Sequence, residues 1–123
     1  MTIHDIIDQA LHEAKQRGLV ILRNGAMYSW CKPDSTWSDT PTACCALGAV
    51  LIFHKKAKPG FSRGWYKDLC DILGVDTYWL WRFWQGFNNG CPLKIIIQKD
   101  GKDIEVEDKV SKIGVKLAKK YRG

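Results

Sequence analysis

The sequence lacks an apolar run long enough to cross a membrane. Its longest fully apolar run covers residues 43–53, whereas a membrane-spanning helix needs about 20 such residues. The first residues, Met-Thr-Ile-His-Asp, also lack the basic start and apolar block of a signal peptide. We therefore expect a cytoplasmic protein that is not processed and has no membrane partner.

The residue patterns of common metal and phosphate sites are missing too. No two of the five cysteines have zinc-knuckle spacing, and the three histidines are scattered. The segment between Gly86 and Gly90 is typical of a helix end and not of a phosphate loop. Glu105 and Glu107 alternate beside lysines, which indicates a solvated surface and not an acid/base pair. The sequence predicts neither a metal site nor a cofactor.

What the sequence does have is a block of apolar residues that predicts a buried helix at the centre of the fold. Asp39 or Thr40 can cap the helix, Pro41 suits its first position, and residues 43–53 contain no polar side chain. A helix that is apolar on every face needs neighbours on every side. We therefore expect one compact domain over residues 1–123, α+β and mainly α, with about five helices around this one.

The flanking segments supply the other elements. Helical spacing and end signals predict helices from Thr2 to Gly18, from Ser62 to Gly74, from Asp76 or Thr77 to Gly90, and from about Asp108 onward. Two short β-hairpins are expected, one over residues 19–31 around Asn24-Gly25 and one over residues 94–107 around Asp100-Gly101.

Positive charge is concentrated at the end of the chain. The last predicted helix carries six cations and no acid after Asp108, namely Lys109, Lys112, Lys116, Lys119, Lys120 and Arg122. These residues can attract phosphates or an acidic protein surface. The alternative is a solvated helix face with cations suitably placed near its C-terminus.

One face of the helix that ends near Gly90 is unusual for its composition. At 100° per residue it gathers two aromatic rings, a guanidinium and two amides, from Tyr78, Trp81, Arg82, Gln85 and Asn89. Aromatic and Arg side chains are enriched at interface hot spots, so this aromatic face is the candidate ligand-binding site. The alternative is that Tyr78 and Trp81 pack beneath the first hairpin or the C-terminal tail.

Thiol chemistry gives the alternative function. Cys45 and Cys44 are both expected in the first turn of the central helix, where the dipole stabilises a thiolate, and Cys45 is the preferred nucleophile. His54 on the same helix is too far from Cys45 to serve as its base, so His4 or His12 would have to be brought in by folding. A cysteine beside Ala and Leu is otherwise a small buried hydrophobe. We expect free, reduced thiols and no catalytic residue.

A short motif resembles small phage and bacterial proteins. It consists of Cys45-Ala46-Leu47-Gly48-Ala49 after a first helix and Trp30-Cys31, followed by a helix that ends at Asn88-Asn89. The similarity covers about residues 3–90, and Asn89-Gly90 stands where an Asn-Asp pair would be expected. It implies a phage or prophage accessory protein that interferes with a host process, and it implies no catalytic residues.

Together these features predict a non-enzymatic binding protein. Its expected partner is an anionic, nucleotide-like small molecule or an acidic host protein, met by the aromatic face. A nucleotide could stack on Trp81 or Tyr78 while Arg82 meets a phosphate. Nucleic acid is a less favoured partner, because no domain signature supports it. The alternative is a thiol-dependent enzyme that uses Cys45 or Cys44.

Overall fold

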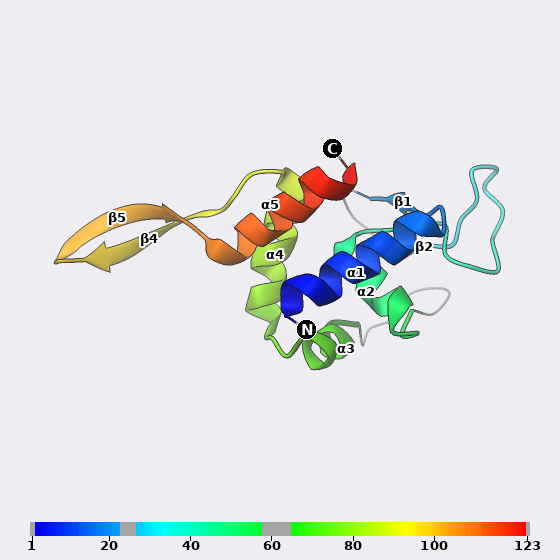
Figure 1. Cartoon of the computed structure of the whole chain (residues 1–123), viewed down its shortest axis with the longest axis horizontal. Helices are drawn as coiled ribbons and strands as arrows, with labels where there is room; N and C mark the ends of the chain where they lie inside the picture. The colour runs from blue at the N-terminus through cyan, green and yellow to red at the C-terminus, as the bar shows by residue number, and fades with distance from the viewer. Residues whose placement is uncertain (1, 23–26, 58–64, 123) are drawn as a thin grey trace. The chain divides into compact units, whose positions relative to one another are not determined.

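The structure, a computed structural model, describes residues 2–22, 27–57 and 65–122 (Figure 1). Within these ranges it contains five helices and five short strands, so the fold is α+β and mainly α, as predicted. The chain divides into two compact units, Met1–Thr77 and Tyr78–Gly123. The single domain expected over residues 1–123 stays a prediction. None of the helices in the described ranges is long and apolar enough to cross a membrane.

The first unit begins with α1 (Ile3–Gln16), whose ends match the prediction. Thr2 and Asp5 form a capping box, in which Asp5 N donates to Thr2 Oγ1 and Thr2 N donates to Asp5 Oδ2. These hydrogen bonds lower the pKa of Asp5. Gly18 follows the helix at φ +81°, a left-handed conformation that suits glycine. The helix buries one stripe, formed by Ile7, Ala10, Leu11 and Ala14.

The buried helix α2 (Ala46–Phe53) starts later than the sequence predicted. Its N-cap is Cys45 and not Asp39 or Thr40, and its first six residues are buried while Phe53 is partly exposed. The preceding residues form β3 (Ala43–Cys44), whose backbone is engaged in a sheet and cannot also extend the helix. In the first unit α1 and α3 (Trp65–Leu73) pack against α2 (Figure 1).

The hairpin expected over residues 19–31 is corrected by the structure. β1 (Val20–Ile21) pairs in parallel with β3, and β2 (Tyr28–Ser29) pairs antiparallel with β3, so β3 lies between them. Apolar and β-branched composition indicates strands but does not reveal their partners, which here come from beyond residue 40. The predicted Asn24-Gly25 turn lies outside the described residues, as does the predicted cap at Ser62.

Close backbone contact brings the strands near α2. Cys45 N donates to Met27 O at 2.8 Å. A Cβ added at Gly48 would lie 1.7 Å from Met27 O, so only glycine fits at this position of α2. After α3, which buries Leu69 and Leu73, Gly74 adopts φ +68° as the predicted helix stop.

The second unit contains α4 (Thr77–Asn89) from Tyr78 onward, a hairpin and α5 (Lys109–Arg122). α4 buries Leu80, Phe83 and Phe87, and the last two rings are stacked with their centroids 6.0 Å apart. Gly90 ends the helix at φ +72°, as predicted.

Two glycines set the distance between α4 and α5. A Cβ on Gly86 would lie 2.0 Å from Ser111 O, and a Cβ on Gly114 would lie 2.4 Å from Phe83 O. Each helix therefore presents a glycine to the backbone of the other, and the two approach more closely than side chains would allow.

The hairpin of the second unit has the predicted turn. β4 (Lys94–Lys99) and β5 (Lys102–Glu107) pair antiparallel along their full length, from Lys94↔Glu107 to Lys99↔Lys102. Asp100 and Gly101 connect them at φ +54° and +75°, as an Asp-Gly turn requires. Within this unit the two strands extend away from α4 and α5 as an arm (Figure 1); we call them the β4–β5 arm.

Candidate functional site

Two aromatic side chains at the start of α4 are exposed to solvent. Tyr78 is 58% exposed and Trp81 is 49% exposed. Their rings are stacked, with centroids 6.2 Å apart and planes 15° from parallel. The three-residue spacing on one helix brings them together, as the sequence predicted for the aromatic face. Large exposed rings held in a fixed mutual geometry are a feature of recognition surfaces.

Arg82 joins this pair but does not offer a free charge. Its guanidinium lies 4.8 Å from the centroid of the Tyr78 ring, and its Nη1 is 2.7 Å from Asp108 Oδ1. The Asp108 side chain is 2% exposed and that of Arg82 is 23% exposed, so the ion pair is largely shielded from water. Arg82 is thus balanced by a carboxylate within the second unit, and it positions Tyr78.

Asp108 is a residue of this site that the sequence analysis did not single out. It caps α5, because Ser111 N donates to Asp108 Oδ2 at 2.8 Å and Lys112 N donates to Asp108 O at 3.1 Å. Ser111 Oγ in turn accepts from Leu93 N at 2.9 Å. The Asp108 carboxylate therefore binds both the first turn of α5 and Arg82. The Ser111 hydroxyl, which donates to Asp108 O, binds Leu93 just before β4. An Asp before a helical pattern with Ser three residues later is a signal that could have indicated this cap.

The two amides of the aromatic face engage each other. Asn89 Nδ2 donates to Gln85 Oε1 at 2.9 Å, a contact made possible by their spacing of one helical turn. Asn89 is exposed and Gln85 is partly exposed, so both lie on the surface with Tyr78 and Trp81.

The C-terminal cations separate into two groups. Lys109, Lys112, Lys116 and Lys119 are exposed along α5, and no ion pair to any of them is found in the described part of the chain. We call these four the lysine stripe. Arg122 instead donates to Phe87 O in the last turn of α4 and lies 4.5 Å from the Phe87 ring. Lys120 Nζ lies 5.3 Å from the Tyr121 ring.

The structure gives the two candidate thiols different surroundings. Cys44 lies in β3 and is fully buried, and burial, with a smaller contribution from Cys45, raises its pKa to about 12. Cys45 is 3% exposed, and its Sγ accepts from Gly48 N at 3.4 Å and lies 3.5 Å from Met27 Sδ. The prediction that both lie in the first turn of a helix is thus corrected: Cys44 precedes the helix and Cys45 caps it.

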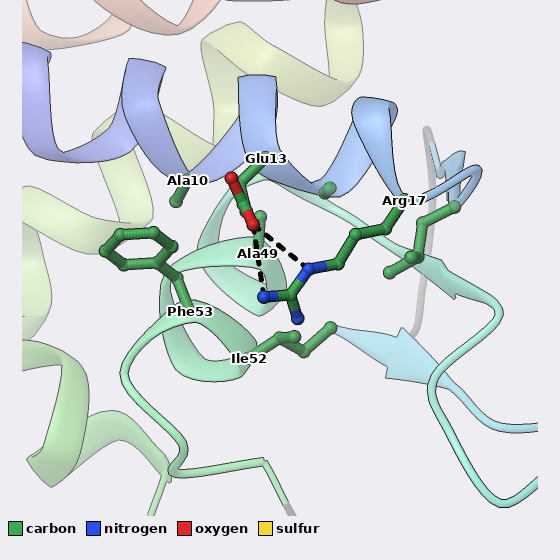
Figure 2. A pocket seen from close by; sticks show the side chains of 8 residues that line it. Ala10, Glu13, Arg17, Ala49, Ile52 and Phe53 are labelled. Atoms are coloured by element: carbon green, nitrogen blue, oxygen red, sulfur yellow. Dashed lines mark hydrogen bonds and ion pairs between the residues drawn. The ribbon is translucent and has the colours of Figure 1, made fainter.

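A small hollow is present in the first unit, between α1 and α2. It is lined by Ala10 and Ala49 and flanked by Ile52 and Phe53, with the Glu13–Arg17 ion pair across it (Figure 2). Its volume of about 10 Å³ suits a single water molecule and not a metabolite. In the described ranges, no three His, Cys, Asp or Glu side chains cluster as metal ligands would.

Comparisons of the chain with family models, curated proteins and solved structures found no match. The resemblance to phage and bacterial proteins therefore stays a prediction.

Proposed function

We propose that this protein is a non-enzymatic binding protein whose aromatic face captures an anionic, nucleotide-like ligand. The observation that carries the proposal is the stacked pair of Tyr78 and Trp81, each about half exposed. A planar base can stack on such rings, which contributes about 1–3 kcal/mol per base. The same rings would serve as hot spots if the partner were an acidic surface of a host protein.

The ion pair between Arg82 and Asp108 helps to fix the Tyr78 ring before a ligand binds. Arg82 is fixed by Asp108 and holds the Tyr78 ring from one side. A ring that is already positioned loses little conformational entropy when a ligand stacks on it. Because Asp108 balances Arg82, the ligand's negative charge would be met by other cations, and the lysine stripe in the same unit supplies them.

In the setting that the resemblance implies, the protein would be a phage-type accessory or inhibitor protein. It would act in the host cytoplasm by withholding a nucleotide-like molecule or by covering an acidic host protein. Neither role needs a catalytic group, which agrees with a site made of rings, amides and a balanced ion pair.

Titration with adenosine monophosphate, adenosine and inorganic phosphate tests the proposal. In NMR spectra, adenosine monophosphate should shift the Trp81 indole N–H signal, adenosine should do so more weakly, and phosphate alone should leave it in place. Trp81→Ala should weaken binding by about 1–3 kcal/mol, or roughly 5- to 150-fold. The matched control is Trp37→Ala, which removes a Trp that is 75% exposed in the first unit and should leave binding unchanged.

Stability measurements separate a binding role from a structural one. If Trp81 recognises a ligand, Trp81→Ala should change the melting temperature little, since the ring is already half exposed. If Trp81→Ala had a much lower melting temperature but bound the ligand normally, the proposal would be contradicted. Arg82→Ala is not suitable for this purpose, because it leaves the Asp108 carboxylate, 2% exposed, without its partner.

Thiol chemistry at Cys45 is the second candidate function, and one observation favours it. The sulfur of Cys45 accepts a backbone N–H at the N-terminus of α2, which is where a helix stabilises a thiolate. The burial of Cys45, which is 3% exposed, argues against this function, because a nucleophile must reach its substrate. Alkylation of the folded protein, described in the Discussion, distinguishes the two functions.

A further inference from the structure

The β4–β5 arm is a two-stranded sheet with exposed apolar side chains. Ile96 is 73% exposed, Ile97 is 39% exposed and Ile104 is 36% exposed. Neither strand pairs with any third strand in the described residues. An isolated hairpin is marginally stable in water, and its outer edges present unpaired backbone N–H and C=O groups. An arm of this kind is completed when another strand joins one of its edges.

Charge distinguishes the two edges of the arm. β5 carries three acids, Asp103, Glu105 and Glu107. β4 carries no acid and has three consecutive isoleucines between Lys94 and Lys99. Charged side chains protect an edge strand against pairing, whereas an apolar, β-branched edge favours it. β4 carries its charges only at its two ends, whereas those of β5 alternate along the strand. The open edge of the arm is therefore β4.

We propose that two copies of this chain pair through their β4 edges, forming a four-stranded antiparallel sheet in the order β5-β4-β4-β5. The proposal is independent of the ligand-binding function proposed above. A closed two-fold arrangement is the commonest form of homo-oligomer, and it uses the same patch on both subunits.

The side-chain pattern selects the register. In an antiparallel pair, residues directly opposite each other point to the same face of the sheet. A two-fold axis at Ile96 sets this residue against its own equivalent, Ile95 against Ile97, and Lys94 against Gln98. No charge then faces a like charge, and the most exposed isoleucine is covered by its counterpart.

The corresponding arrangement through β5 is unfavourable. An axis at Glu105 would set two glutamates opposite each other and Asp103 opposite Glu107. An axis at Ile104 would set Asp103 opposite Glu105. Like charges directly opposite across a strand pair are destabilising. The sequence of the arm thus allows closure through one edge and opposes it through the other.

Sedimentation equilibrium of the full chain tests the proposal. The wild type should interconvert between a species of 14.0 kDa and one of about twice that mass. Ile96→Lys puts two ammonium groups opposite each other at the axis and should raise the dimer dissociation constant at least about tenfold. The matched control is Val20→Lys, on the edge strand β1, where the residue is 63% exposed and the dimer should persist.

Hydrogen exchange of the unaltered protein gives a test that does not depend on a variant folding. Raising the protein concentration should protect amides of β4 that point away from β5, and should leave the outward amides of β5 unchanged. A monomer at all concentrations, a dimer unaffected by Ile96→Lys, or protection of both outer edges with growth into larger polymers would each overturn the proposal.

Discussion

Cys44 and Cys45 are adjacent in the chain but belong to different elements: Cys44 lies in a strand, and Cys45 is the N-cap of a helix. Cys44 is buried within β3, and its pKa of about 12 keeps the thiol protonated in the folded protein. Cys45 is 3% exposed and caps α2. Cys31 and Cys91, by contrast, are exposed. The thiols of this protein therefore differ in their access to solvent by position.

The rate of alkylation should differ between the exposed and the buried cysteines. Treated with iodoacetamide at pH 8, the folded protein should react rapidly at Cys31 and Cys91, while Cys44 and Cys45 should react only after unfolding in guanidinium. Peptide mapping by mass spectrometry gives the extent of labelling at each site. Rapid, complete labelling of Cys45 in the folded state would instead favour the thiol-dependent enzyme.

The raised pKa of Cys44 also gives a direction for stability against pH. The unfolded thiol releases its proton near its ordinary pKa of 9.0, whereas the folded thiol keeps its proton up to about 12. Between these values the folded state binds more protons, so the free energy of unfolding falls as the pH rises.

At the scale of helices, the contact between α4 and α5 depends on the absence of two side chains. Gly86 and Gly114 each meet the backbone of the opposite helix at a distance that no Cβ could tolerate. Backbone atoms cannot move aside as the end of a flexible side chain can. The helices would have to separate to admit a methyl group, and the packing of Phe83 and Phe87 would loosen with them.

Gly114→Ala should therefore destabilise the protein, although alanine favours helix by about 1 kcal/mol. We expect a net loss of about 1–3 kcal/mol in the free energy of unfolding, measured by urea titration. Lys116→Ala, on the exposed side of the same helix, is the control and should change stability by less than about 0.5 kcal/mol. If Gly114→Ala were as stable as the parent, the close contact of α4 and α5 would be wrong.

The sequence predicted the elements whose signals are local. The capping box of Thr2 and Asp5, the glycine stops at Gly18 and Gly74, and the Asp100-Gly101 turn all depend on residues a few positions apart. β3 could not be predicted in this way, because its two residues are defined by partners more than ten positions earlier. The apolar run 43–53 predicts helix from its first residue, but its first two residues pair in the sheet as β3.

The candidate site shows the same limit. Helical spacing was enough to bring Tyr78 and Trp81 together. It did not reveal that Arg82 would be balanced by Asp108, which is 26 residues away. Nor did it show that Arg122 would contact Phe87. Composition identifies which side chains can meet an anion, but only the pairing between α4 and α5 decides which of them are free to do so.

For the molecule as a whole, charge is unequally divided between its two units. The chain has 19 basic and 13 acidic residues, and ten of the basic but only five of the acidic ones follow Thr77. Nearly all of the net charge of +6 therefore belongs to the second unit, which also carries the aromatic face. An anion approaching the protein would be attracted mainly to this unit.

Binding of adenosine monophosphate should accordingly weaken as salt is added. Between 50 and 500 mM NaCl the screening length falls several-fold, so exposed lysines lose most of their attraction. Lys112→Ala combined with Lys116→Ala should reduce this salt dependence, measured by calorimetric titration. Lys32→Ala with Lys56→Ala, which removes two exposed cations from the first unit, should not. Equal salt dependence in both double variants would exclude the lysine stripe from binding.

The central position of β3 has a consequence for the order of folding. β1 and β2 leave the ribosome first, yet each finds its partner only when residues 43 and 44 have been made. The last strand must enter between the earlier two, and one of its two pairings is parallel and closes a loop of more than twenty residues. Such non-local pairing is slow, because the loop between the strands loses conformational entropy before the strands gain any contact. The capping box of α1 is formed by residues at the start of the helix itself, whereas the N-cap of α2 follows β3 directly, so we expect α2 to become stable only when the sheet has closed.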